Sequence, residues 1–277
     1  MLKIKSILNI VLFFALQLAS QYAKAQDSNY SILYNYKDSF GVELESLLLV
    51  NGDESYFSII DERDSGMQYD EEGNFDHFVT NDKIGTIMYT NNQDVYVRIP
   101  FPEVTKGTTY KYNTEDLPWN LTGNTKVIKK FNCQEATLNF HGRNYRVWFS
   151  SEIPISKGPF NLNGLPGVIV SFEELTGKYA IDIVSVKKNG GEKMKDKISN
   201  YFNSNKVKTY SAYQKFMKQY ILDMKIKKAQ QISELIKKEG GTISFDFDLG
   251  QYHWVSKIID IPTGLIEELA KIDFYEN

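Results

Sequence analysis

Side chains that could do chemistry are few and widely spaced in this 277-residue chain. The three histidines, His77, His141 and His253, form neither an HExxH nor an HxH pair, the kind of spacing that a zinc site needs. His77 ends an acidic run over residues 70–77, where carboxylates could join it on a metal, but the run lacks the DxDxDG spacing of a calcium loop. The sequence therefore predicts no metal site and no cofactor, and an acidic surface loop at 70–77.

Nucleophiles are equally scarce. Cys133 is the only cysteine, so no intrachain disulfide can form, and its place in an alternating run predicts a buried, unreactive thiol. The serine motif GxSxG is missing. Arg143 and Arg146 are three residues apart in a predicted strand, so they point to opposite faces and cannot form one anion clamp. The sequence therefore favours a binding protein over an enzyme. A hydrolase with two carboxylates on an open face is the alternative.

A corner rich in proline and glycine follows this strand. Ile153-Pro154 and Gly158-Pro159 disfavour helix before each proline. In Gly164-Leu-Pro-Gly167, the last two residues fit the central positions of a type II turn, which predicts a positive φ at Gly167. The run lacks the Lys-Ser/Thr of a phosphate-binding loop. We interpret it as a structural corner, with a ligand- or partner-binding loop as the alternative.

Residues 119–172, which include this corner, resemble the GLPGLI family, secreted proteins of Bacteroidetes-type bacteria. Val168 replaces the second leucine of the family hexad, which keeps an apolar side chain there. The resemblance implies export to the cell envelope, periplasmic or secreted, and brings no catalytic residue with it. We interpret the positions that carry it as structural; they are Cys133, Gly142, Arg143, Trp148, Pro154, Gly158, Pro159, Gly164, Leu165, Pro166 and Gly167.

The first 25 residues have the pattern of a secretory leader. Lys3 and Lys5 precede an apolar run over 7–18, and Ala23-Lys-Ala25 fits a cleavage site. Cleavage would leave a single domain, residues 26–277; since it removes three lysines and no acid, the formal net charge changes from −3 to −6. That balance does not favour nucleic acid as a partner. No later run is long and apolar enough to span a membrane.

Period-2 alternation in short runs, bounded by turn residues, dominates the chain after the leader. Strands are predicted over residues 30–36, 43–50, 55–61, 83–90, 94–99, 108–113, 126–132, 134–141, 144–150, 167–173 and 179–187. Short turns make consecutive strands antiparallel. So many strands must curl, which predicts a half-barrel, with a β-sandwich as the alternative.

Helical spacing of apolar residues appears only over residues 209–239, where it predicts one long amphipathic helix capped by Thr209 or Ser211. Two further strands, 242–249 and 253–259, and a short helix, 265–272, are predicted to follow. The class is α+β with a mainly antiparallel sheet. A helix over the concave side of a curled sheet is similar, by element order alone, to the LolA-type lipoprotein carriers.

The helix is the predicted binding element, because its apolar face is rich in aromatic residues and methionine. The predicted ligand-binding residues are Trp148, Tyr213, Phe216, Met217, Tyr220 and Met224. We interpret the chain as a monomeric, secreted binding protein for an apolar or envelope-derived ligand. The alternative is an accessory or scaffold subunit of an envelope transport or secretion complex, docking an envelope protein.

Charge is divided along the chain. Residues 26–82 hold 14 Asp and Glu against 2 Lys and Arg, and residues 183–238 hold 14 Lys against 4 Asp and Glu. The basic part either packs against the acidic part within the fold, steers partners, or is drawn to anionic lipid. The simplest explanation is that the lysines are solvated, with their stems over an apolar face, and that the division of charge has no special role.

Overall fold

The computed structural model describes residues 29–38, 41–60, 66–69, 75–79, 81, 83–100, 107–140, 143–177, 179–189, 196, 200–202, 207–220 and 222–223. The predicted leader and the elements predicted after residue 223 lie outside these residues, as do His141, Gly142 and Met224. In the described part of the chain, we find no helix with the length and apolar character of a membrane span.

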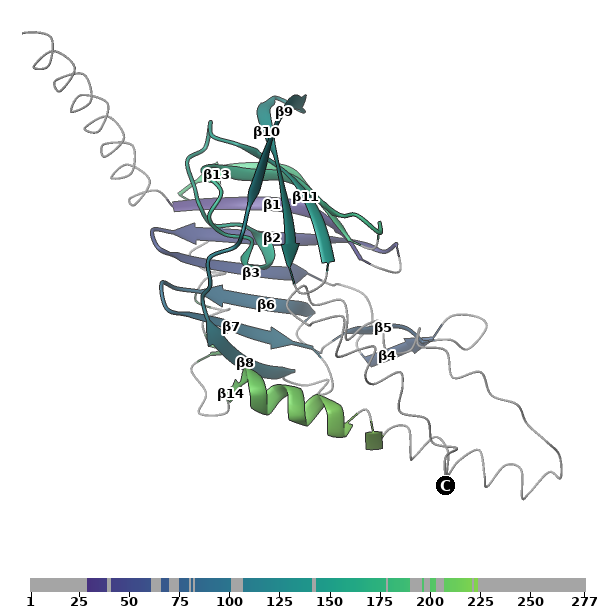
Figure 1. Ribbon diagram of the computed structural model, residues 1–277. Helices are drawn as coiled ribbons and strands as arrows, with labels where there is room; N and C mark the ends of the chain where they lie inside the picture. The colour runs from purple at the N-terminus through teal and green to yellow at the C-terminus, as the bar shows by residue number, and fades with distance from the viewer. Residues whose placement is uncertain are drawn as a thin grey trace, which may run out of the picture.

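One large sheet forms most of the described fold (Figure 1). Its strand order is β14-β8-β7-β6-β3-β2-β1-β13-β12-β11-β10-β9. The bounds are β1 (Asn29–Lys37), β2 (Glu43–Asn51), β3 (Glu54–Ile60), β6 (Ile84–Thr90), β7 (Asp94–Ile99), β8 (Thr108–Asn113), β9 (Asn120–Ile128), β10 (Phe131–Phe140), β11 (Arg143–Ser150), β12 (Val168–Glu174), β13 (Ala180–Lys188) and β14 (Lys208–Thr209). All neighbours are antiparallel except β14 and β8.

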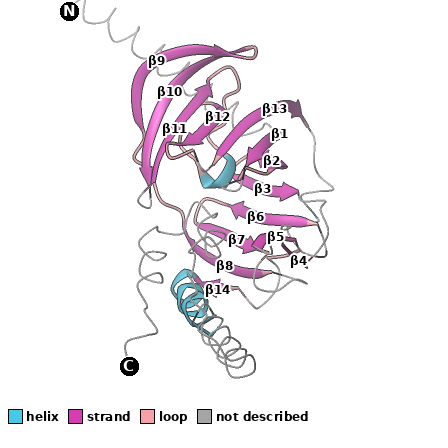
Figure 2. Cartoon of the chain, turned by 90° about the vertical axis from the view of Figure 1, so that its right-hand side faces the viewer, coloured by secondary structure: helices cyan, strands magenta, loops and turns pink. Residues whose placement is uncertain are grey.

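The sheet curls without closing, so the predicted half-barrel and α+β class are confirmed (Figure 2). Register shifts help to explain the curl, because an extra residue in one strand bends it and increases its twist. Such shifts occur at Leu33/Tyr34 in β1, Ser58/Ile60 in β3, Gln134/Ala136 in β10 and Trp148/Phe149 in β11.

Two predictions about strands need correction. The strand predicted over 126–132 contains a turn, because Lys129 takes a φ of 53° and the chain reverses between β9 and β10. Lysine is not a typical turn residue, so the sequence at Lys129 and Lys130 gave no sign of this reversal. The acidic run predicted as a loop contains part of a second, two-stranded sheet of β4 (Gly66–Tyr69) and β5 (Phe75–Val79).

The concave side of the sheet is filled by the corner, residues 151–167, and not by the helix as predicted. Within the corner, the short helix η1 (Pro159–Asn161) lies inside the curl (Figure 2). Phe160 has a φ of 52° and Asn161 a φ of 61°, which reverses the chain and turns the Phe160 ring into the core. That ring lies 4.4 Å from Phe57 between centroids. Four residues of this segment are buried in the core, as a structural corner requires: Ile155, Phe160, Leu162 and Leu165.

The helix lies at the β8 end of the sheet (Figure 1). Residues 210–220 are helical, and Thr209 caps them by accepting a hydrogen bond from the Ala212 N–H at 3.2 Å, as predicted. Tyr213 stacks on Tyr110 of β8, with centroids 4.1 Å apart and ring planes 11° apart. The helix sits here because Tyr110 and its neighbours offer an aromatic surface, while the corner already occupies the concave side.

A ladder of tyrosines crosses the sheet on β3, β6 and β7. Tyr56 pairs with Tyr89, and Tyr89 with Tyr96, so their rings stack at 4.7 and 5.6 Å. Phe202 packs against Tyr89 and Tyr96, and Tyr201 packs over the buried Arg98 guanidinium. These two residues of the lysine-rich segment therefore lie against β6 and β7, which are outside the acidic part of the chain.

Candidate functional site

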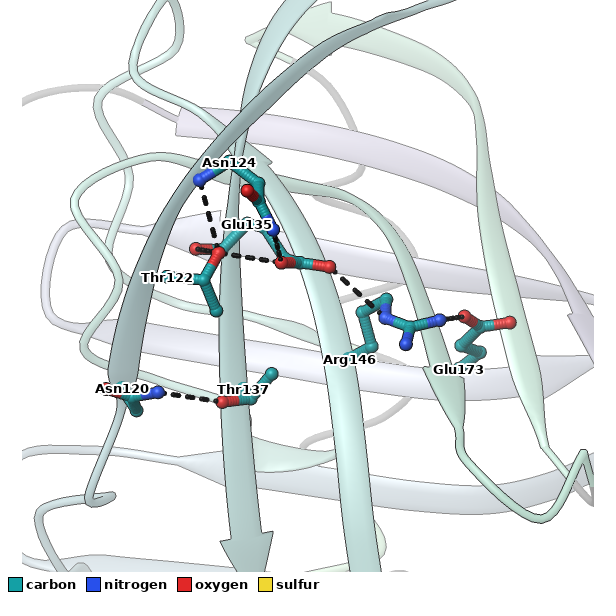
Figure 3. A network of polar contacts seen from close by, with 7 residues as sticks. All are labelled: Asn120, Thr122, Asn124, Glu135, Thr137, Arg146 and Glu173. Carbon is teal, nitrogen blue, oxygen red and sulfur yellow. Dashed lines mark hydrogen bonds and ion pairs between the residues drawn. The ribbon is translucent and has the colours of Figure 1, made fainter.

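A polar network lies across β9, β10, β11 and β12, on the side of the strands turned away from the corner (Figure 3). Glu135 of β10 is its centre. One carboxylate oxygen accepts hydrogen bonds from the Thr122 hydroxyl at 2.6 Å and the Asn124 amide at 2.7 Å. The other oxygen lies 3.2 Å from Nε of Arg146. Both oxygens of this carboxylate are therefore directed at partners within the sheet.

A bulge in β9 makes this arrangement possible. Ala136 pairs with Leu121 and Gln134 with Thr125, so three residues of β9 face Glu135 alone. Gly123 takes a φ of 81° in the bulge, a backbone conformation that glycine adopts without strain. The bulge brings both Thr122 and Asn124 onto the same carboxylate.

The two arginines of β11 point to opposite faces, as predicted. Arg146 bridges Glu135 and Glu173 on the polar side, with its NH1 group 2.8 Å from the Glu173 carboxylate. Arg143 is buried on the core side, where its guanidinium lies 5.1 Å above the Tyr179 ring. No single anion site uses both side chains.

The network keeps Glu135 charged. The Thr122 and Asn124 hydrogen bonds, and then the Arg146 charge, hold the pKa of Glu135 below its ordinary value. A general acid needs the opposite, a raised pKa that keeps the proton near neutral pH. Glu135 is therefore a structural anchor for β9, and it does not serve as the acid of a hydrolase.

Replacing Glu135 with glutamine should destabilise the protein by about 1 kcal/mol at neutral pH, because it removes a charged hydrogen-bond acceptor that is 10 % exposed. The folded-state pKa lies below the unfolded-state value, so this stabilisation is present above the unfolded pKa. It is lost as the pH falls through the folded pKa. Melting curves should therefore differ at neutral pH and converge in strongly acidic buffer. Glu173→Gln, a half-exposed control, should show a smaller difference at neutral pH; equal effects would contradict the anchoring role.

An open cleft of ≈ 480 Å³ adjoins the network, at the open end of the β9–β10 hairpin and at the turn end of the β10–β11 hairpin. The described residues that line it are all uncharged: Pro118, Asn120, Thr137, Leu138, Asn139, Asn144, Tyr145 and Leu175. Leu138 and Tyr145 are buried and form an apolar wall of the cleft, whereas Leu175 is 49 % exposed. The cleft thus combines an apolar surface with amide and hydroxyl groups.

Two hydrogen bonds order the polar side chains of the cleft. The Asn139 amide donates to the Asn144 side-chain oxygen at 2.8 Å, and the Asn120 amide donates to the Thr137 hydroxyl at 3.3 Å (Figure 3 shows the second pair). In this orientation the side-chain oxygens of Asn120 and Asn139 remain available as acceptors. The Asn144 amide and the Thr137 hydroxyl remain available as donors.

The predicted ligand-binding residues are not brought together by the described fold. Tyr213 and Met217 are buried in the core, and Phe216 and Tyr220 pack at its margin. Trp148 lies on β11, where the Lys126 ammonium sits 4.0 Å from its ring centroid. Met224 lies outside the described residues, so a groove formed by the whole helix remains a prediction.

The remaining motif residues are distributed through the core and the corner. Cys133 is buried, as predicted, and burial raises the pKa of its thiol. Gly164 takes the positive φ, 97°, that was predicted for Gly167, so the type II turn assignment is wrong. Gly167 instead approaches the backbone of Ser150, where a side chain has no room. Within the described residues, no group of three His, Cys, Asp or Glu side chains could hold a metal ion.

Comparison with known proteins gave likeness to solved structures only: no family model and no curated protein matches the chain. Two crystal structures of PNGF-II are 15 and 16 % identical, with TM-scores of 0.44 and 0.47 over 66 and 68 % of this chain. The chain covers about a third of the PNGF-II length, 31 and 32 %.

Two smaller proteins are also similar. An uncharacterized conserved protein from Thermus thermophilus is 8 % identical, with a TM-score of 0.39 over 70 % of this chain and 98 % of its own. The LolA superfamily protein NE2245 from Nitrosomonas europaea is 12 % identical, with a TM-score of 0.25 over 64 % of this chain and 95 % of its own. Values this low support no inference about function.

Proposed function

We propose that this chain is an exported, non-catalytic binding protein of the GLPGLI type that holds a neutral ligand in the cleft beside the β9–β12 network. The observation that carries the proposal is the described lining of the cleft, in which no residue is an ionisable carboxylate, amine or imidazole. Among these described residues a charged ligand would find no counter-charge, and a reaction would find no acid or base apart from the buried Tyr145.

The polar groups of the cleft match a secondary amide. The amide carbonyl of a ligand can accept from Asn144, and its N–H can donate to the free oxygen of Asn139 or Asn120. Leu138 and Leu175 lie beside these groups and can cover adjoining methyl or methine groups. Acetamido sugars and peptides share this chemistry, and both are abundant in a cell envelope.

The corner fills the interior of the curled sheet, which favours the cleft as the ligand site. Phe160, Leu162 and Leu165 are buried on the concave side, where an apolar ligand of a half-barrel would otherwise lie. Export remains part of the proposal, supported by the leader pattern of residues 1–25.

Titration with N,N′-diacetylchitobiose and with acetyl-trialanine-amide, followed by calorimetry, tests the proposal. At least one of the two should bind saturably. If the chitobiose binds, cellobiose, which lacks the acetamido groups, should bind at least tenfold more weakly. Asn144→Leu should weaken binding tenfold or more, because it removes the donor. Asn113→Leu, the same change at an exposed position on β8, is the matched control. Absence of binding to both amide probes would overturn the proposal, as would binding that is insensitive to Asn144→Leu.

A further inference from the structure

The two ends of the large sheet differ. At one end, β8 is paired with β14 and packed against the helix through Tyr110 and Tyr213. At the other end, β9 is the last strand, and among the described residues no strand pairs with its outer edge (Figure 1). A free edge presents unpaired backbone N–H and C=O groups and can accept another strand.

Apolar side chains are exposed along this strand. Val127 is 67 % exposed and Leu121 57 %, the two highest values among large apolar side chains in the described residues. Leucine and valine in a strand normally lie against a core or a partner, since each side chain gains about 1.5–3 kcal/mol on full burial. The exposure of both residues on one edge strand indicates a surface that becomes covered on association.

The bulge divides β9 into a protected part and an open part. Thr122 and Asn124 are bound to Glu135, and the Asn124 N–H also donates to the Thr122 hydroxyl at 3.2 Å, which interrupts a regular edge. Beyond the bulge, pairing with β10 is continuous from Thr125 to Ile128. These four residues keep an extended backbone that an incoming strand can pair with.

Charge decides between possible partners. Residues 120–130 contain three lysines, Lys126, Lys129 and Lys130, and no acidic residue. Two copies of this edge would repel each other, and lysine at an edge is a common guard against self-pairing. Lys126 is drawn over Trp148, which leaves the backbone edge itself unobstructed. This edge would therefore attract an acidic strand and repel a second copy of itself.

We propose that the Thr125–Ile128 edge of β9 is a docking site for an extended segment of a partner protein in which apolar and acidic residues alternate. The backbone of that segment pairs with the edge, its apolar residues cover Val127, and its acidic residues are attracted by the net positive charge of residues 126–130. Within that run, the Lys126 ammonium lies over Trp148 and the Lys129 ammonium donates to the Ile183 carbonyl. Binding by strand addition takes affinity from the backbone and selectivity from alternate side chains.

Fluorescence anisotropy with the full chain and a labelled peptide, acetyl-Val-Asp-Val-Glu-Val-Asp-Val-amide, tests this proposal. The peptide should bind saturably, and its counterpart with lysine in place of the three acids should bind at least tenfold more weakly. Two further peptides carry N-methyl groups on alternate residues, one set on the valines and one on the acids. One of these should lose binding tenfold or more, because N-methylation on the pairing side removes the backbone donors while keeping charge and apolarity.

Val127→Asp should weaken binding tenfold or more, whereas Asn113→Asp should not change it. Asn113 is exposed at the end of β8, at the opposite end of the sheet from β9, so it is the matched control for an added carboxylate. Absence of peptide binding, full binding of both N-methylated peptides, or equal effects of the two aspartate variants would each overturn the proposal. None of these outcomes depends on a ligand in the cleft.

Discussion

Gly167→Ala is expected to destabilise the protein by about 3 kcal/mol or more, the upper range for overpacking in a core. A β-carbon at this position would lie 2.2 Å from the Ser150 carbonyl oxygen and 2.7 Å from the Ser151 nitrogen. Both are backbone atoms at the end of β11, so neither can rotate away as a flexible side chain would. The corner would have to separate from the sheet to admit one methyl group.

Thermal unfolding measures this effect, and the melting temperature should fall by roughly 6–12 °C for a domain of this size. Gly177→Ala is the matched control, because Gly177 has a φ of 79° in the β12–β13 turn and open space around its α-carbon. That variant should lose only about 1 kcal/mol, from backbone strain. Equal losses in the two variants would show that close packing at Gly167 is not what requires glycine.

Phe160→Ala should cost about 3–5 kcal/mol, the usual range for deleting a buried phenylalanine ring. The ring is 3 % exposed and contacts three other rings, with centroids 4.4 Å from Phe57, 5.2 Å from Tyr36 and 6.2 Å from Phe172. These rings belong to β3, β1 and β12, so one side chain connects both halves of the curled sheet.

Denaturant unfolding of Phe160→Ala and Phe216→Ala compares the corner with the helix. Phe216 packs only at the margin of the core, so Phe216→Ala should lower the free energy of unfolding clearly less than Phe160→Ala does. If Phe216→Ala were as destabilising as Phe160→Ala, the helix and not the corner would be the element that closes the fold.

Local signals in the sequence predicted the strands and the class of the fold well. Along β11, Tyr145, Val147 and Phe149 alternate with polar or amphipathic residues, and the structure buries those three. The end of β9 was missed because the reversal at Lys129-Lys130 uses residues that rarely form turns. The inward turn of the corner was missed because it depends on a positive φ at Phe160, for which a phenylalanine gives no signal.

The cleft could not be predicted for a different reason. Asn120, Asn144 and Leu175 come together only because β9, β10, β11 and the end of β12 adopt one register. None of these residues belongs to a motif, and exposed asparagines at strand ends are common. Asn139 faces Asn144 because the β10–β11 turn falls after Phe140, one residue earlier than the end of the predicted strand 134–141.

The position of β1 in the sheet has a consequence for how the chain reaches its native state. The order contains two meanders, β1 to β8 and β9 to β13, and they meet where Tyr30 pairs with Lys188. Each meander can assemble from neighbouring strands, but this junction must close a loop that contains nearly all of both, and long loops slow folding. During synthesis, which begins at the N-terminus, β1 emerges long before β13 does. Its edge therefore waits unpaired until the second meander arrives, and that is the period in which the protein would most need protection from aggregation.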